Sequence, residues 1–181
     1  MSLAGIFTAI IIAMSVVPFL GYIPLGFMNA TIIHVPVIIG AIILGPKYGA
    51  YLGLVFGVTS LVKATIAPGV TSFVFSPFVT IVAYFVYKLI MKAAHGIKGS
   101  QTVALWVAGI AGAMTNTLLV MNGIYIFFGQ SYAAASNKAV EHIYDVILGI
   151  ILGFGIPEAI VAGILTTAIT KVLFKIMKDN G

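Results

Sequence analysis

Long apolar runs constrain this chain more than any other feature of its sequence. Six such runs, separated by short segments rich in glycine, proline or lysine, cover most of its 181 residues. A helix that crosses the hydrocarbon core of a bilayer needs about 20 mostly apolar residues, so the runs leave no room for a separate soluble domain. We therefore expect one membrane-embedded domain over residues 1–181: an all-α integral membrane protein, built as a six-transmembrane-helix bundle.

Turn residues set the expected ends of these helices. Gly45-Pro46 and Ala67-Pro68-Gly69 are examples, because glycine and proline interrupt helical patterns. The predicted spans are Leu3–Leu20, Asn29–Leu44, Tyr48–Ile66, Phe78–Ala94, Gln101–Phe128 and Pro157–Lys175.

The region before the last span allows two interpretations. We expect Tyr132–Gly155 to be an outer segment, partly helical, because Gly149 and Gly153 would break a helix and Pro157 suits a first helical position. A seventh, partial span over Val146–Phe154 is the alternative.

The few charges indicate orientation rather than nucleic-acid binding. Only 7% of the residues are charged, and the nine cations lie along the chain at the ends of apolar runs. No nucleic-acid partner is therefore expected, although the net charge is +5. With six spans, one side of the membrane receives Lys47, Lys88, Lys92, Lys98, Lys171, Lys175 and Lys178, and the other receives Lys63 and Lys138. Since lysine favours the cytoplasmic side, both termini are expected in the cytoplasm.

Small residues at four-residue spacing predict where helices meet, because they allow close backbone approach in lipid. Gly49, Gly53 and Gly57 form such a stripe, which we expect to pack against another helix of the chain. Similar structural stripes are Gly109, Gly112, Asn116 and Gly123, and Ala159, Ala162, Gly163, Thr166 and Thr170. The first helix carries Gly5, Ala9 and Ala13, and its stripe could pack internally or dock another membrane protein.

Polar residues inside a membrane are costly and therefore informative. Singly, Lys63 could extend to the interface, Glu158 could stabilise the first turn of its helix, and His34 could be structural. The more specific interpretation pairs Lys63 with Glu158 or with a carboxylate of a ligand. Together, the polar residues of the outer half predict an outward-opening pocket for a small molecule, lined by Phe73, Phe75 and Tyr125. These polar residues are Asn29, His34, Lys63, Asn122, Tyr125 and Glu158.

Several classes of protein lack support in the sequence. There is no phosphate-binding glycine loop, acid pair, metal-ligand cluster or nucleophile beside a base, so we predict no catalytic residue, no metal and no enzyme. Inverted repeats that would support a self-sufficient transporter are not evident. The class of protein that remains is a substrate-binding helical bundle that takes its energy from another protein.

Several of these motifs together resemble those of a known family. The residues that carry the resemblance are Ala9-x-x-x-Ala13, Asn29-x-Thr31-x-x-His34-x-Pro36, Gly45-Pro46 followed by Gly49, Gly53 and Gly57, and Thr71-Ser72-Phe73-x-Phe75-Ser76-Pro77. Through them the chain resembles the substrate-binding (S) components of energy-coupling factor (ECF) vitamin transporters. It is most similar to the pantothenate type, with the hydroxymethylpyrimidine or pyridoxine type second.

The resemblance implies how the chain would work. It would capture a water-soluble vitamin at a bacterial cell membrane and dock on a membrane coupling protein, the T component, through its first helix. Two ATPase subunits would use ATP, and this chain would hold no cofactor. The implied docking residues are Gly5, Ala9 and Ala13, and the expected binding residues are Asn29, His34, Lys63, Ser72, Phe75, Asn122, Tyr125 and Glu158.

Two alternatives stay open. For pantothenate, either Lys63 or His34 would hold the carboxylate of the vitamin. Relatives often carry an arginine early in the fourth helix, where this chain reads Phe78-Val79-Thr80, so their ligand contacts do not transfer directly. A structural membrane subunit, with its polar groups paired among themselves, is the alternative outside transport.

Overall fold

The computed structural model of the chain describes residues 2–17, 20–24, 29–63, 66–135 and 142–179. Within these ranges, the side chains of residues 22–24, 29, 30, 63, 66–68, 132 and 135 are not described. The elements are α1 (Leu3–Val16), β1 (Tyr22–Pro24), β2 (Asn29–Thr31), α2 (His34–Leu44), α3 (Pro46–Lys63), α4 (Ile66–Ala93), α5 (Ser100–Ala135), α6 (Ile143–Ile150), the π-helical segment η2 (Ile151–Gly155) and α7 (Ile156–Asp179).

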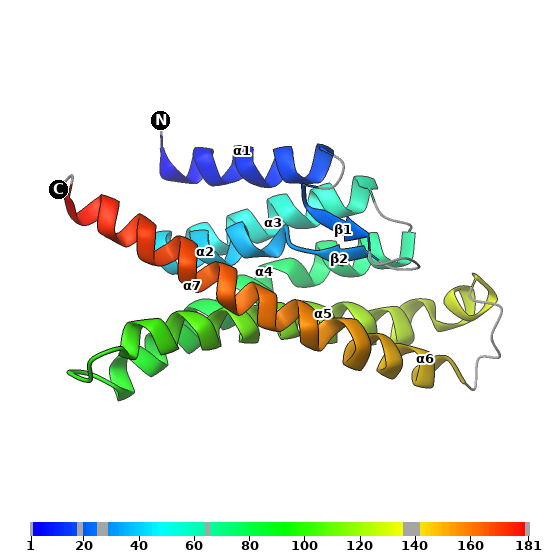
Figure 1. Cartoon of the computed structure of the whole chain (residues 1–181). Helices are drawn as coiled ribbons and strands as arrows, with labels where there is room; N and C mark the ends of the chain where they lie inside the picture. The colour runs from blue at the N-terminus through cyan, green and yellow to red at the C-terminus, as the bar shows by residue number, and fades with distance from the viewer. Residues whose placement is uncertain (1, 18–19, 25–28, 64–65, 136–141, 180–181) are drawn as a thin grey trace.

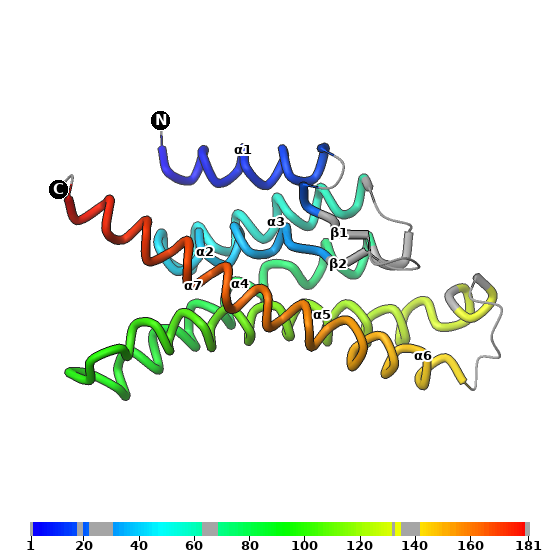
Figure 2. The backbone as a smooth tube through the Cα atoms, viewed as in Figure 1, coloured from blue at the N-terminus to red at the C-terminus, as the bar shows by residue number. Residues whose placement is uncertain are grey.

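The helices form rods that alternate in direction (Figure 1). The elements α1, α2, α3, α4 and α5 are separate rods, and α6, η2 and α7 join into one more, which the backbone trace shows as a continuous path (Figure 2). Both termini lie at the same end of the bundle, and the hairpin of β1 and β2 lies at the other (Figure 1).

Helix length and composition identify an integral membrane protein. Within the described residues, Gly69–Ala93, Ser100–Ser131 and Ile143–Asp179 are long and apolar enough to cross a bilayer, whereas Leu3–Val16 and His34–Leu44 are apolar but shorter. Large apolar side chains point outward, for example Leu89 of α4, which is 68% exposed. Such exposure suits a lipid environment, because lipid tails are as apolar as leucine.

The second helix begins later than predicted. Asn29–Thr31 belongs to an antiparallel hairpin in which Thr31 pairs with Tyr22, and α2 starts only at His34. The predicted start at Asn29 is therefore wrong, as is the predicted end of the first helix at Leu20, because α1 ends at Val16. The short hairpin satisfies backbone groups where the chain reverses, which hydropathy alone does not reveal.

The fourth helix includes the loop that the sequence predicts. Rather than starting at Phe78, α4 starts at Ile66 and continues through Pro77. Proline is tolerated inside membrane helices where neighbouring groups satisfy the backbone. Two hydroxyls near Pro77 bond to carbonyls of the same helix: Thr80 Oγ1 donates to the Pro77 carbonyl at 2.7 Å, and the Ser76 hydroxyl donates to the Ser72 carbonyl. Neither acceptor is the Phe73 carbonyl, which is the group that loses its N–H partner to Pro77.

The C-terminal region also differs from its prediction. Helix α5 extends to Ala135 rather than Phe128, and Ile143–Asp179 is one helical rod. The expected break at the glycines and the alternative partial span over Val146–Phe154 are therefore both wrong. Nothing lies within 4 Å of a Cβ built on Gly149 or Gly153, so these glycines neither interrupt the helix nor mark a contact.

The spacing of the buried residues explains why the π-helical segment forms. Buried positions recur every four residues from Ile143 through Ile147 and Ile151 to Gly155 and Ala159. A regular helix has 3.6 residues per turn, so a four-residue step drifts by about 40° and the stripe would leave the contact face. Hydrogen bonding in a π-helix takes in more residues per turn, which holds the stripe against its neighbours.

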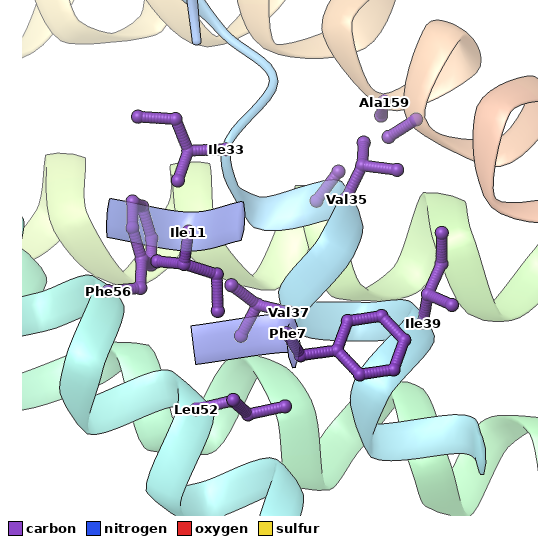
Figure 3. Packing of buried hydrophobic residues seen from close by; sticks show 11 residues of the cluster. Phe7, Ile11, Ile33, Val35, Val37, Ile39, Leu52, Phe56 and Ala159 are labelled. Carbon is purple, nitrogen blue, oxygen red and sulfur yellow. The ribbon is translucent and has the colours of Figure 1, made fainter. Parts of the chain in front are cut away.

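Glycines mark the closest helix contacts, as predicted. A Cβ on Gly53 would stand 2.8 Å from Pro77 Cα, and one on Gly57 would stand 2.8 Å from Phe73 Cα, so the stripe of α3 packs against α4. The main apolar core joins α1, α2, α3, α5 and α7; Figure 3 shows Val35 of α2 facing Ala159 of α7. This packing fixes α2 beside α7, where the polar residues described next lie.

Candidate functional site

A polar pair lies inside the apolar bundle. His34 Nδ1 of α2 is 3.5 Å from Glu158 Oε1 of α7; the His34 side chain is fully buried and that of Glu158 is 12% exposed. The backbone of Thr31 in β2 also lies beside the Glu158 carboxylate. Glu158 therefore connects the start of α7 to both the hairpin and the start of α2.

Local structure explains why these residues meet. His34 is the first residue of α2, directly after the hairpin. Glu158 lies in the first turn of α7, directly after the π-helical segment. The next residues along each helix, Val35 and Ala159, pack in the apolar core. The pair thus lies where α2 begins and where α7 continues the last rod beyond the π-helical segment.

Helix α5 supplies a third polar residue at the same level. A Cβ on Gly112 would stand 2.6 Å from Ile38 Cδ1 of α2. The two rods run in opposite directions (Figure 1), and residues four apart share a helix face. One turn toward the hairpin, Asn116 of α5 therefore lies level with His34 of α2.

A second contact gives the same placement. A Cβ on Gly155 of η2 would stand 2.7 Å from Thr117 Cγ2, the residue that follows Asn116. Gly155 precedes Glu158 by less than one turn, so α2, α5 and the last rod meet around these polar side chains. Sequence reasoning assigned Asn116 only to a structural stripe; its place beside Gly109 and Gly112 was the signal that it faces the interior.

The polar atoms at this level are incompletely paired. Within the described residues, Nδ1 and Nε2 of His34 and Oδ1 of Asn116 are buried without a hydrogen-bond partner. The 3.5 Å separation of His34 Nδ1 and Glu158 Oε1 is longer than an ordinary N–H···O hydrogen bond. An imidazole, an amide and a carboxylate can together donate to and accept from hydroxyl, amide or water groups.

The other predicted residues of α5 do not join this cluster. The Asn122 amide donates to the Leu118 carbonyl of its own helix at 2.8 Å. Tyr125 is 43% exposed, and its ring packs against Tyr144 of α6 with the centroids 5.1 Å apart. Both lie further toward the end of α5 than Asn116 does.

The predicted residues of α4 lie near α5. A Cβ on Gly123 of α5 would stand 2.7 Å from Phe75 Cε2 and 3.0 Å from Thr71 Cγ2. Ser72 is half-buried, and its carbonyl accepts from the Ser76 hydroxyl. Phe75 therefore occupies the α4–α5 contact rather than a loop over the site.

Two predicted binding residues are described only by their backbone. Asn29 begins β2 and Lys63 ends α3, but their side chains lie outside the described part of the structure. The expected contact between Lys63 and Glu158 is therefore untested. Among the described residues, no group of three or more His, Cys, Asp or Glu side chains could hold a metal ion.

The stripe on the first helix is exposed. Gly5, Ala9 and Ala13 face away from the bundle, whereas Phe7 and Ile11 of the same helix are buried. A Cβ on Gly5 would meet only the hydroxyl of Ser2, at 3.4 Å. Of the two possibilities that the sequence left open, the described residues provide no internal packing partner for this face.

The fold and this polar cluster define a class: a membrane-embedded helical bundle with a polar site in its interior and without enzyme machinery among its described residues. The chain matches the family model of the ECF transporter, substrate-specific component, over residues 2–170. It therefore belongs to the family of substrate-specific components of ECF transporters, which are transporter subunits and not enzymes, and which work with ECF T and ATPase subunits.

Two curated relatives are similar over most of their length. One is the pantothenic acid transporter PanT of Lactococcus lactis subsp. cremoris, 36% identical over 177 residues, which cover 84% of this chain and 82% of the relative. The other is the pantothenate transporter PanT of Leuconostoc mesenteroides subsp. mesenteroides, 32% identical over 187 residues, which cover 97% of this chain and 92% of the relative.

Proposed function

We propose that this chain captures pantothenate outside a bacterial cell and delivers it across the membrane as the S component of an ATP-driven ECF transporter. The observation that carries the proposal is that two relatives, similar over most of this chain, are named for pantothenate transport. Family membership argues against the alternative of a structural membrane subunit.

We propose six spans with both termini in the cytoplasm. The alternating rods and the shared end of the two termini support this topology (Figure 1). Lysines support it as well: Lys47 lies in the first turn of α3, Lys98 in the turn between α4 and α5, and Lys178 in the last turn of α7, all at the end that carries the termini. Lysine-rich loops favour the cytoplasm, so the hairpin end faces outward.

We propose that the vitamin binds at the hairpin end, near the buried polar cluster. The full set of candidate binding residues is Asn29, His34, Lys63, Ser72, Phe75, Asn122, Tyr125 and Glu158. Because the carboxylate of Glu158 already lies beside His34, a second carboxylate there would meet a like charge. Of the two candidates for the carboxylate of pantothenate, Lys63 is therefore favoured over His34.

We propose that Gly5, Ala9 and Ala13 dock the T component, while two ATPase subunits supply the energy. Their exposure and four-residue spacing support this role, since small residues allow close approach of a partner helix.

Binding by the purified chain tests the proposed function. Titration calorimetry with pantothenate, hydroxymethylpyrimidine and pyridoxine, with mass spectrometry of any ligand that copurifies, should find tight binding of pantothenate alone. Tight binding of one of the other two would replace the substrate. Failure of all three to bind would reject the assignment to this group of vitamins.

A further inference from the structure

The interface of α2, α5 and α7 contains polar atoms that the described part of the chain does not satisfy. His34 is fully buried, and neither of its ring nitrogens has a hydrogen-bond partner there. Asn116 is a half-buried residue, and its buried Oδ1 also lacks a partner there, as do the hydroxyls of Thr166 and Thr170 further along α7. A buried donor or acceptor without a partner is costly, and native proteins rarely leave one without a reason. Two such side chains at one level of an apolar bundle indicate a place for polar groups of a ligand.

Asn116 differs in this respect from its neighbours on α5. The hydroxyl of Thr115 donates to the Ala111 carbonyl at 2.7 Å, and Thr117 packs against Gly155. Asn122, further along the helix, donates to the Leu118 carbonyl at 2.8 Å. These polar side chains are satisfied or packed within the fold, so Asn116 alone among them has a buried side-chain acceptor without a partner in the described structure.

The chemistry of the cluster selects the part of the substrate that fits it. Glu158 Oε1 lies 3.5 Å from His34 Nδ1, so the cluster already holds one carboxylate and would repel another. An imidazole and an amide both combine donor and acceptor capacity. Hydroxyl and amide groups match that capacity, and pantothenate carries such groups at the end opposite its carboxylate.

We propose that Asn116, together with His34, binds the hydroxyl and amide groups of the substrate and thereby determines recognition of its neutral end. This inference rests on the proposed uptake of pantothenate and adds a residue that the candidate site did not include. The substrate is oriented with its neutral end in the interior, between α2 and α5, and its carboxylate toward the hairpin end of the bundle.

The proposed role of Asn116 can be tested by measuring the binding of two ligands to two variants. Titration calorimetry on the purified full chain compares pantothenate with pantothenol, in which an alcohol replaces the carboxylate. Asn116→Leu should weaken binding of both ligands by about tenfold or more, because each loses the same hydrogen bonds. The matched control Thr115→Val changes a neighbouring side chain whose hydroxyl is satisfied within α5, and it should leave both affinities unchanged.

Thermal unfolding of the ligand-free protein separates binding from a structural role. Asn116→Leu removes an unpaired buried acceptor, so the melting temperature of the ligand-free chain should stay the same or rise. If the leucine variant does not yield folded protein, Asn116→Ala takes its place in the affinity comparison, with the same expected losses.

Unchanged affinity of the Asn116 variant for both ligands would overturn the inference, as would a loss confined to pantothenate, which would place Asn116 at the carboxylate. A wild-type chain that binds neither ligand would reject the proposed function itself. If only the role of Asn116 is wrong, the wild-type chain still binds pantothenate, so this result can be told apart from failure of the proposed function.

Discussion

Gly109 of α5 lies so close to Gly163 of α7 that a Cβ on Gly109 would stand 2.8 Å from the Cα of Gly163. No real Cβ tolerates that distance to a backbone atom, so even a methyl group would push the two helices apart. Thr166 Oγ1 lies 3.0 Å from the same point and closes the contact from one turn further along α7. This contact sets the spacing of the two rods that carry Asn116 and Glu158.

We predict that Gly109→Ala destabilises the bundle by about 1–3 kcal/mol, because overpacking a close helix contact forces the backbones apart. Fluorescence-detected thermal unfolding should show a melting temperature lower by several degrees. Gly149→Ala is the control, since nothing lies within 4 Å of its Cβ and alanine favours a helix over glycine. Equal melting temperatures for the two variants would contradict the packing argument.

The pair of His34 and Glu158 should be energetically coupled. In a double-mutant cycle with His34→Leu and Glu158→Leu, the double variant should lose about 1–3 kcal/mol less stability than the two single variants together, because each single change strands a buried polar partner. Chemical unfolding of the purified chain measures the cycle. His142 and Asp145 provide a control pair at 3.7 Å whose side chains are 70% and 77% exposed; their coupling should stay below about 0.5 kcal/mol. If the coupling energy of His34 and Glu158 were no larger than that of the exposed pair, the buried pair would not stabilise the fold.

The sequence predicted much of the architecture and only part of the site. Apolar runs located the helices, and stripes of small residues predicted which faces of α3 and α5 are buried, because in lipid close packing depends on small side chains. Which helices these faces contact, α4 and α7, came from the structure. Helix ends were less predictable. Pro77 and Gly153 interrupt helices in water, but a membrane helix continues through them because no water competes for its backbone.

The candidate site, like the helices, was predicted only in part. The sequence placed His34 and Glu158 in one pocket, but it matched Glu158 with Lys63, since opposite formal charge was the only available criterion. The contact with His34 depends on how the hairpin orients the start of α2, and a backbone contact such as that of Thr31 leaves no mark in the sequence. Asn116 was read as part of a packing stripe, because spacing identifies the inward face and not what that face contacts.

Docking should be separable from binding. We predict that Ala9→Trp abolishes pantothenate uptake by cells while the purified chain keeps its affinity, because a bulky side chain on the exposed face of α1 blocks a partner helix and touches no binding residue. Uptake of radiolabelled pantothenate and calorimetry measure the two properties. Leu89→Trp, at a position of α4 that is 68% exposed, is the matched control and should leave both unchanged. Normal uptake with Ala9→Trp would reject the docking face.

The carboxylate of the substrate should depend on Lys63. We predict that Lys63→Met lowers the affinity for pantothenate by about tenfold or more, since a charge-assisted hydrogen bond is lost, and leaves the affinity for pantothenol nearly unchanged. Calorimetry with both ligands measures the difference. Lys88→Met removes a cation near the opposite end of the bundle and should alter neither affinity. Equal losses for the two ligands with Lys63→Met would show that this side chain acts on stability rather than on the carboxylate.

The π-helical segment should be required for the register of the last rod. Deleting Gly153 removes the extra residue of η2, so the segment before it would turn by about 100° relative to α7. Ile143 and Ile147, both fully buried, would then leave the α5 contact. We predict a clear drop in the melting temperature, because these buried contacts of α6 are lost. Gly153→Ala keeps the residue count and meets open space, so it should behave as the wild type. Full stability after the deletion would mean that the four-residue spacing of the buried stripe does not hold the segment in place.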